Sequence, residues 1–178
     1  LIVSGGGGKS LYDYNSNGGV RAAKVSFNRP LTQTVYDGAD PWQAIFVRWL
    51  DKNGYVADFC SSVDLHNDLT LLDDYQLFVT VGHDEYWTRE MREHLDTFRS
   101  RGGNVAIFGG NTCWFQARLE HTPDTKGLRT LTCYKSRSAD PIKKESLKTV
   151  TWVELVPSWP ENSTIGLSTV YGATWANG

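Results

Sequence analysis

One six-residue segment carries a dense group of chemically reactive side chains. Gly82 to Trp87 holds an imidazole, two carboxylates and a phenol at four successive positions. His83 and Glu85 are two residues apart, so they share one side of the chain if the backbone is extended there. A carboxylate beside a histidine suits metal binding or the activation of a water molecule. Asp84 is better interpreted as a cap of the following helix, so we expect His83 and Glu85 to carry the chemistry.

A second polar and aromatic segment runs from Gly109 to Trp114. Its glycines allow another backbone to approach closely, and Asn111 can both donate and accept hydrogen bonds. Cys113 raises a further hypothesis, a cysteine-dependent amidotransferase that iodoacetamide would inactivate. However, Cys113 is not followed by the glycine that a sharp nucleophile turn prefers. A buried and unreactive cysteine is therefore the favoured interpretation.

Both segments directly follow predicted buried strands. The apolar runs Leu77–Val81 and Asn104–Phe108 are typical of strands in a covered, parallel sheet. Between them Thr88 is placed to cap a helix. In sheets of this kind ligands bind beyond the carboxyl ends of the strands. We therefore expect the two polar segments to lie side by side. The buried stripe of the intervening helix is predicted to contain Met91, Leu95 and Phe98.

The other patterns predict a single α/β domain over residues 1–178, with a mostly parallel, helix-covered sheet. A helix is predicted to begin at Asp40-Pro41 and to end at Asn53-Gly54, and Asp64–Asp74 is predicted as a short helix or turn. Further strands are predicted over Leu1–Ser4, Ala22–Phe27 and Tyr55–Cys60. From about residue 128 the pattern changes to strands joined by loops. These strands are Leu131–Tyr134, Thr149–Val156 and Ser168–Tyr171.

Composition narrows the class of protein. The 178 residues are 40% hydrophobic and 21% charged, which is ordinary for a globular domain. A net charge of −2 without a basic stripe indicates no nucleic-acid partner. No apolar run approaches the roughly 20 residues that span a bilayer, so no membrane partner is expected. The strand-rich end suggests a piece of a longer chain or a chain with missing loops. Self-association, contacts with other domains, and a cytoplasmic or a secreted location all stay open.

The glycines at 5–8, followed by Lys9-Ser10, partly match a phosphate-binding loop. That motif requires a further glycine five residues before Gly8, and the sequence has Val3 there. A flexible turn is the better interpretation, so no nucleotide cofactor is expected.

A series of short motifs, in this order, resembles the C-terminal-type domain of the large subunit of N,N-dimethylformamidase and of uncharacterised bacterial proteins that share this domain. The resemblance spans nearly the whole chain. Its most specific element is the Gly-His-Asp-Glu-Tyr-Trp string at 82–87. The motifs are Lys9–Asp13, Arg29-Pro30, Phe46–Leu50, Asp64–His66, Val81–Trp87, Gly109–Thr112 and Pro160–Ser163.

The resemblance implies a class I glutamine-amidotransferase-like fold. In dimethylformamidase this fold carries a mononuclear iron, held by two tyrosinates and a glutamate, that serves to hydrolyse a small amide. By motif, Glu85 matches the glutamate ligand and Tyr12 matches one tyrosine ligand. His83 matches the nearby histidine and Asn111 matches an asparagine of the substrate pocket. Glu161 lies in a segment that aligns loosely with a further acidic group.

The sequence departs from the family pattern after the first predicted strand. The family has its other tyrosine there, whereas this chain has the glycines at 5–8. Tyr14 is a conceivable substitute, although its register does not support that role. One Tyr and one Glu are too few protein ligands to hold a hard metal ion tightly.

The leading hypothesis is a metal-dependent amidohydrolase that acts on a small amide. Tyr12 and Glu85 would hold iron, which would polarise the amide carbonyl or lower the pKa of a bound water. His83 would act as the general base or orient the water, and Asn111 would hold the substrate. The residues expected to complete the substrate site are Trp87, Trp114 and Glu161.

The alternative hypothesis is a non-catalytic module that binds carbohydrate or cell-surface material. The absence of the second family tyrosine favours it, because the metal site would then be incomplete. Aromatic side chains can stack on sugars. The tryptophans that would supply this surface are Trp42, Trp87, Trp114, Trp152, Trp159 and Trp175.

Overall fold

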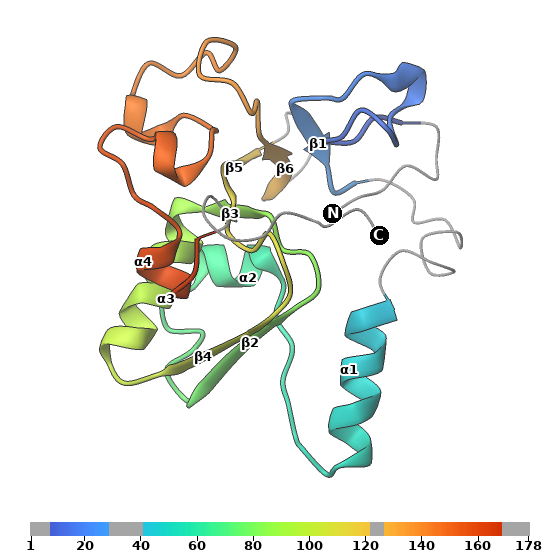
Figure 1. The fold of residues 1–178 in the computed structure, drawn as a ribbon, viewed down its shortest axis with the longest axis vertical. Helices are drawn as coiled ribbons and strands as arrows, with labels where there is room; N and C mark the ends of the chain where they lie inside the picture. Colours follow the sequence, from blue (N-terminus) through green and yellow to red (C-terminus); the bar gives the residue numbers. More distant parts are fainter. Residues whose placement is uncertain (1–7, 29–40, 122–126, 169–178) are drawn as a thin grey trace.

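The computed structural model describes residues 8–28, 41–121 and 127–168, which form a mixed α/β fold with two sheets (Figure 1). The first sheet has the strand order β1-β6-β5-β3 and the second pairs β2 with β4. The strands are β1 (Lys24–Ser26), β2 (Leu77–Val81), β3 (Tyr86–Thr88), β4 (Asn104–Phe108), β5 (Phe115–His121) and β6 (Leu128–Thr132). The α-helices are α1 (Pro41–Lys52), α2 (Ser62–Asn67), α3 (Arg89–Ser100) and α4 (Asn162–Ile165).

The two-stranded sheet confirms the two predicted strands and their parallel pairing, but the prediction that both are buried is wrong, because Leu77 is 53% and Phe108 57% exposed. β2 and β4 pair in parallel, from Leu77 opposite Asn104 to Val81 opposite Phe108. Helix α3 lies between them in the chain and begins at the predicted cap, because the Thr88 side chain accepts a hydrogen bond from the Met91 amide. Its buried residues include the predicted stripe of Met91, Leu95 and Phe98.

The four-stranded sheet is mixed, so the prediction of a mostly parallel sheet is wrong for it. β3 and β5 are parallel, whereas β5 pairs with β6 and β6 pairs with β1 in antiparallel fashion. The connection from β5 to β6 spans only residues 122–127. A parallel neighbour needs a crossover of a dozen or more residues, so this connection allows only an antiparallel return. A glutamine-amidotransferase-like arrangement is not confirmed by this topology.

Several other predicted elements have definite outcomes. The helix from Pro41, the strand within Ala22–Phe27 and a strand near Leu131 are confirmed. Tyr55–Cys60 is not a strand, and Val56 is 98% exposed there, so its apolar pattern does not mark burial. Thr149–Val156 forms a single bridge at Thr151 and a 3-10 helix over Trp152–Glu154 instead of a strand. The strand predicted for Leu1–Ser4, the cap Asp40 and most of Ser168–Tyr171 lie outside the described residues.

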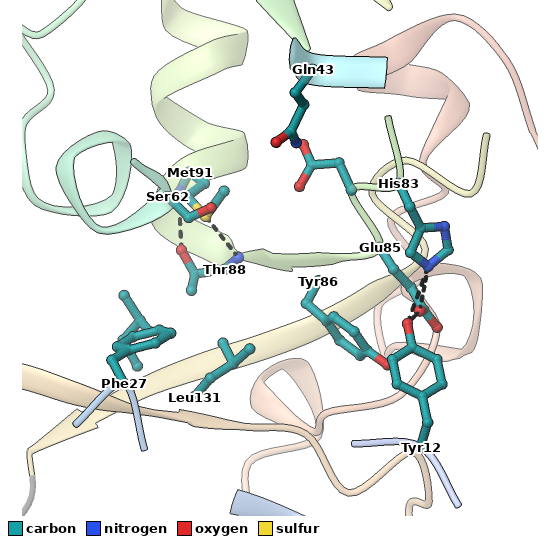
Figure 2. Close-up of a pocket in the computed structure, with 12 residues that line it drawn as sticks. Tyr12, Phe27, Gln43, Ser62, His83, Glu85, Tyr86, Thr88, Met91 and Leu131 are labelled. Carbon is teal, nitrogen blue, oxygen red and sulfur yellow. Dashed lines mark hydrogen bonds and ion pairs between the residues drawn. The ribbon is translucent and has the colours of Figure 1, made fainter. Parts of the chain in front are cut away.

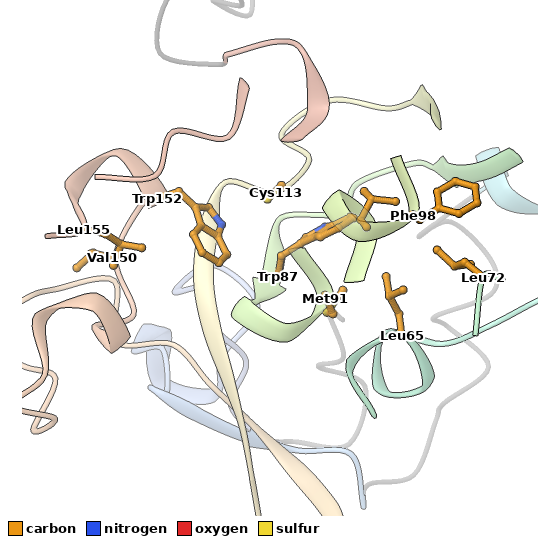
Figure 3. Close-up of a cluster of buried hydrophobic side chains, with 10 residues drawn as sticks. Leu65, Leu72, Trp87, Met91, Phe98, Cys113, Val150, Trp152 and Leu155 are labelled. Carbon is orange, nitrogen blue, oxygen red and sulfur yellow. The ribbon is translucent and has the colours of Figure 1, made fainter. Parts of the chain in front are cut away.

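Two apolar cores lie on opposite sides of β3. One packs α2 and α3 against the C-terminal segment at 150–165. It contains Trp87 and Trp152 (Figure 3). The other packs the N-terminal segment on the mixed sheet and contains Leu11, Tyr86 and Leu131. Successive strand residues point to opposite faces, so Tyr86 and Trp87 enter different cores. Among the described residues no helix is long and apolar enough to cross a membrane.

A buried arginine joins α3 to the C-terminal segment. The guanidinium carbon of Arg92 lies 4.4 Å from the ring centroid of Trp152 and 4.1 Å from that of Trp159. The guanidinium also donates to the carbonyl oxygens of Trp159 and Pro160, at 2.7 and 3.0 Å, and to the Thr164 hydroxyl. Because the side chain has no exposed surface, these partners replace its hydration.

We expect Arg92→Met to lower the free energy of unfolding by about 2–4 kcal/mol, because it removes the donor to the Trp159 carbonyl and the packing of the guanidinium on Trp152 and Trp159. Urea unfolding followed by circular dichroism measures this loss. Arg101→Met is the matched control, since Arg101 pairs with Asp73 on the surface and such pairs contribute about 0–1 kcal/mol. Equal losses for the two variants would contradict the anchoring role of Arg92.

Candidate active site

Three side chains from two segments far apart in the sequence converge at one point (Figure 2). The Tyr12 hydroxyl donates to Glu85 Oε2 and lies 3.1 Å from His83 Nε2. His83 Nε2 lies 3.0 Å from the same Glu85 oxygen. Glu85 is 5% exposed, whereas the His83 side chain is 36% exposed and reaches solvent. The structure thus brings together three of the residues that the sequence singled out, across a separation of more than 70 positions.

The two polar segments lie side by side, as predicted. The Gly82 amide donates to the Phe108 carbonyl at 2.9 Å. A Cβ atom on Gly109 would lie 1.9 Å from the Gly82 carbonyl oxygen, so only glycine fits there. Further along, the Cys113 amide donates to Asp84 O and the Trp114 amide donates to Glu85 O, at 2.9 and 3.0 Å. These bonds hold the backbone at Glu85 in place.

Asp84 does not cap the following helix, so that prediction is wrong. Thr88 takes the cap position, and the Asp84 carboxylate accepts from the Thr80 hydroxyl at 3.0 Å. The Asp84 carbonyl accepts from the Trp87 indole N–H at 3.1 Å. Burial raises the pKa of Asp84, which the Thr80 hydrogen bond partly opposes. Asp84 therefore braces the turn between β2 and β3.

The segment that bears Tyr12 is held by local hydrogen bonds. The Ser16 hydroxyl donates to the Tyr12 carbonyl at 2.6 Å and accepts from the Ser10 amide at 2.9 Å. Leu11, next to Tyr12, is buried in the core on the mixed sheet. Tyr12 therefore projects from a closed turn. Tyr14, the conceivable substitute ligand, is 77% exposed.

Lys135 is the site residue that sequence reasoning missed. Its Nζ lies 3.7 Å from Glu85 Oε1. The same ammonium lies 4.2 Å from the ring centroid of Tyr12 and 5.0 Å from those of Tyr86 and Phe115. Lys135 has a positive φ of 54°, which is uncommon for a residue with a side chain. No motif marks this position, because its partners lie far away in the sequence.

A buried hydrogen-bond network positions Lys135. The Lys135 amide donates to Thr149 O at 2.9 Å. The Thr149 amide and hydroxyl donate in turn to Asp140 Oδ2, at 2.8 and 2.6 Å. Arg118 donates to the same carboxylate at 2.7 Å. Although burial favours the protonated acid, the hydrogen bonds from Arg118 and Thr149 outweigh it and lower the pKa of Asp140.

The charges of Glu85 and Lys135 depend on each other. Burial raises the pKa of Glu85, and the Lys135 ammonium opposes this effect. Burial lowers the pKa of Lys135, and the Glu85 carboxylate opposes that effect. Each group of the pair therefore favours the ionised form of the other, against the effect of burial.

A cavity of about 180 Å³ adjoins these residues. Tyr12, His83, Glu85 and Tyr86 line its polar side (Figure 2). Its other lining includes apolar side chains in or next to the mixed sheet. These are Phe27, Leu119 and Leu131.

The remaining predicted site residues do not join the converging group. Asn111, with a φ of 59°, lies in the adjacent segment, and the described part of the chain shows no hydrogen bond from it to Tyr12, His83 or Glu85. Trp87 is fully buried in the core and has no surface to offer a substrate.

The other two predicted substrate residues also lie apart from the cavity lining. Trp114 is partly exposed and packs edge-on against Phe115. Glu161 is buried and accepts from the Ser168 hydroxyl at 2.7 Å. Their roles in binding a substrate stay predictions.

The thiol of Cys113 is fully buried, and burial raises its pKa well above the ordinary value. A reactive cysteine needs a depressed pKa and access to substrate. This environment agrees with the favoured interpretation of an unreactive cysteine.

The site offers donor atoms of the types that bind metal ions, with one matched tyrosine where the family resemblance implies two. A phenol oxygen, a carboxylate oxygen and an imidazole nitrogen meet at one point and hydrogen-bond to one another. Oxygen and imidazole donors suit iron and related ions. The described residues hold no group of three or more His, Cys, Asp and Glu side chains that could bind a metal. Any metal here would therefore depend on a tyrosine.

We expect Lys135→Met to raise the pKa of Glu85 in the metal-free protein, because the variant removes the cation that favours the carboxylate. A ¹³C NMR titration of the glutamate carboxyl carbons measures it. Lys24→Met serves as the control, since Lys24 pairs with Glu120 on the surface of the mixed sheet. An unchanged Glu85 titration in Lys135→Met would show that the two charges are not coupled.

We expect Asp140→Asn to lower the free energy of unfolding by about 2–4 kcal/mol at neutral pH, because Arg118 and Thr149 lose a buried carboxylate. The pKa of Asp140 lies below its ordinary value near 3.8. Its contribution is therefore complete above that pH and is lost as the pH falls toward the lowered value.

Urea unfolding at a series of pH values tests this prediction. The difference between wild type and Asp140→Asn should shrink below pH 3.8. Asp73→Asn, which alters a surface pair with Arg101, should change stability by about 0–1 kcal/mol. A difference for Asp140→Asn that stays constant down to acid pH would rule out a stabilising carboxylate.

A comparison with family models identifies the family of this chain. A search of the curated proteins returned no match. A family model described as N,N-dimethylformamidase beta subunit-like, C-terminal, matches residues 5–177. This match covers nearly the whole chain and includes Tyr12, His83, Glu85 and Lys135. The chain therefore belongs to the N,N-dimethylformamidase beta subunit-like C-terminal domain family.

Proposed function

We propose that this domain hydrolyses the C–N bond of a small amide at the site formed by Tyr12, His83 and Glu85. The observation that carries the proposal is the convergence of their polar atoms beside a cavity, within 3.1 Å of one another. Family membership supports this class of reaction. The size of the cavity, about 180 Å³, suits a small substrate.

Glu85 and Tyr12 would hold a single metal ion, with iron as the ion that the family resemblance implies. A bound metal ion of this kind polarises a carbonyl group or lowers the pKa of a bound water. In the structure Glu85 Oε2 already accepts from Tyr12, while Oε1 faces Lys135. Lys135 would thus orient the carboxylate by holding its other oxygen.

His83 is placed to move a proton. Its Nε2 lies 3.0 Å from Glu85 Oε2, so the carboxylate can orient the ring and stabilise its protonated form. The side chain is partly exposed, so water can reach it. We assign to His83 the role of general base toward an attacking water. Asn111 would hold the substrate from the adjacent segment, as the resemblance implies.

The carbohydrate-binding alternative has less support. Trp87 and Trp152 are fully buried, and Trp159 is stacked against the guanidinium of Arg92. Trp175 lies outside the described residues, as does the side chain of Trp42. Sugar-binding surfaces need exposed aromatic faces, and most of the described tryptophans proposed for this role are already engaged.

We expect the purified protein to take up close to one iron per chain and to release an amine from N,N-dimethylformamide. Glu85→Ala should lose the metal, because a buried carboxylate oxygen is removed, and the rate of hydrolysis should fall at least about 100-fold. Elemental mass spectrometry and an amine-release assay measure the two effects.

Glu93→Ala is the matched control, since Glu93 is half exposed on α3 and pairs with Arg89. It should retain both iron and activity. Unchanged iron content and hydrolysis in Glu85→Ala would overturn the proposed site. Hydrolysis by metal-free wild type at the full rate would overturn only its dependence on a metal.

A further inference from the structure

Tyr86 carries a buried hydroxyl near the Glu85 carboxylate, and burial together with this carboxylate raises the pKa of the hydroxyl. The residue is 9% exposed, and its hydroxyl makes no hydrogen bond within the part of the chain that the structure describes. A buried polar group without a partner is costly, so native proteins rarely keep one without a reason. Phenylalanine would fill the same space without this cost.

The position of this hydroxyl distinguishes it from the other unpaired polar atoms. Tyr86 lines the cavity beside Tyr12 and Glu85. Figure 2 shows its hydroxyl end turned toward Tyr12. The other buried and unpaired side-chain atoms in the described residues do not line that cavity. They belong to Thr112, Gln116, Thr132 and Trp152.

The ring of Tyr86 is held in place from several sides. It stacks on Phe115 with centroids 6.1 Å apart and planes at 14°. It meets Tyr12 edge-on at 6.0 Å, and the Lys135 ammonium lies 5.0 Å from its centroid. The hydroxyl is therefore fixed before a ligand arrives, which lowers the entropic cost of binding.

The chemistry of the hydroxyl indicates what it would bind. A tyrosine hydroxyl is protonated at neutral pH and can donate one hydrogen bond. A small neutral ligand with a carbonyl oxygen supplies the acceptor. A fixed donor aimed at such an oxygen also stabilises the negative charge that develops there when the carbonyl is attacked.

We propose that the Tyr86 hydroxyl is the hydrogen-bond donor that holds the carbonyl oxygen of a small amide in this cavity. The proposal rests on the proposed amide hydrolysis and adds a substrate-binding residue to it. Tyr86 and Trp87 are adjacent in β3, so their side chains point to opposite faces. Tyr86 contacts the substrate, and Trp87 packs in the core.

The test uses the infrared band of a bound carbonyl. N,N-Dimethylformamide labelled with ¹³C at the carbonyl is added to wild type and to Tyr86→Phe, each with and without iron. A hydrogen bond weakens the carbonyl bond, so the band of the bound amide should lie at lower frequency in wild type than in the variant. The value of kcat/KM should fall about 10-fold to 100-fold in Tyr86→Phe.

Tyr75→Phe is the matched control, because it removes a tyrosine hydroxyl that is bonded to Asp58 away from the cavity. It should leave the band and the kinetics unchanged. Incorporation of 3-fluorotyrosine at position 86 keeps the ring and makes the hydroxyl a stronger donor. It should move the band further to low frequency, and it serves as the test if Tyr86→Phe folds poorly.

The outcomes separate this proposal from the proposed function. An unchanged band and unchanged kcat/KM in Tyr86→Phe would overturn the role of Tyr86 while amide hydrolysis stands. A shifted band in wild type without hydrolysis would support Tyr86 and overturn the proposed reaction. The absence of any bound amide in wild type would overturn the role of Tyr86.

Discussion

Four backbone hydrogen bonds between the segments at 82–85 and 108–115 hold the two sheets together. The Phe108 carbonyl accepts from Gly82, and the carbonyls of Asp84 and Glu85 accept from the amides of the segment that leads into β5. Gly109 makes this approach sterically feasible, because any Cβ there would collide with the Gly82 carbonyl. The parallel pair β2 and β4 thus passes directly into β3 and β5 of the mixed sheet. Glu85 lies at this junction, so its position follows from the contact between the two sheets.

A carboxylate at this junction needs compensation, since it is almost fully buried. Lys135 supplies the opposite charge, and it depends on Thr149, Asp140 and Arg118 for its own position. Residues with no contact to the cavity therefore fix the position of the cation that faces Glu85. The buried network of Arg118, Asp140 and Thr149 thus acts on the site through the backbone of Lys135.

The two aromatic residues of β3 lie on opposite sides of the strand, one in a core and one at the cavity. Trp87 fills the core beneath α3, and its indole N–H is satisfied by Asp84 O. Tyr86 faces the other way, toward Tyr12 and the cavity. Because successive side chains point to opposite faces, a substitution that alters the cavity at Tyr86 need not disturb the packing of Trp87.

The sequence by itself determined the local elements around the site. The apolar runs of β2 and β4, the Thr88 cap and the stripe of α3 depend on neighbouring residues, so their patterns could be read directly. The polar segments after β2 and β4 could be placed together because parallel strands end at one edge. Tertiary structure alone decided the rest. Lys135 reaches Glu85 across 50 positions, and no sequence pattern marks this contact. Tyr12 reaches Glu85 across 73 positions, a contact that only the family resemblance implied. The burial of Trp87 depends on which core its strand faces. Such contacts arise from packing between distant segments, which local patterns do not encode.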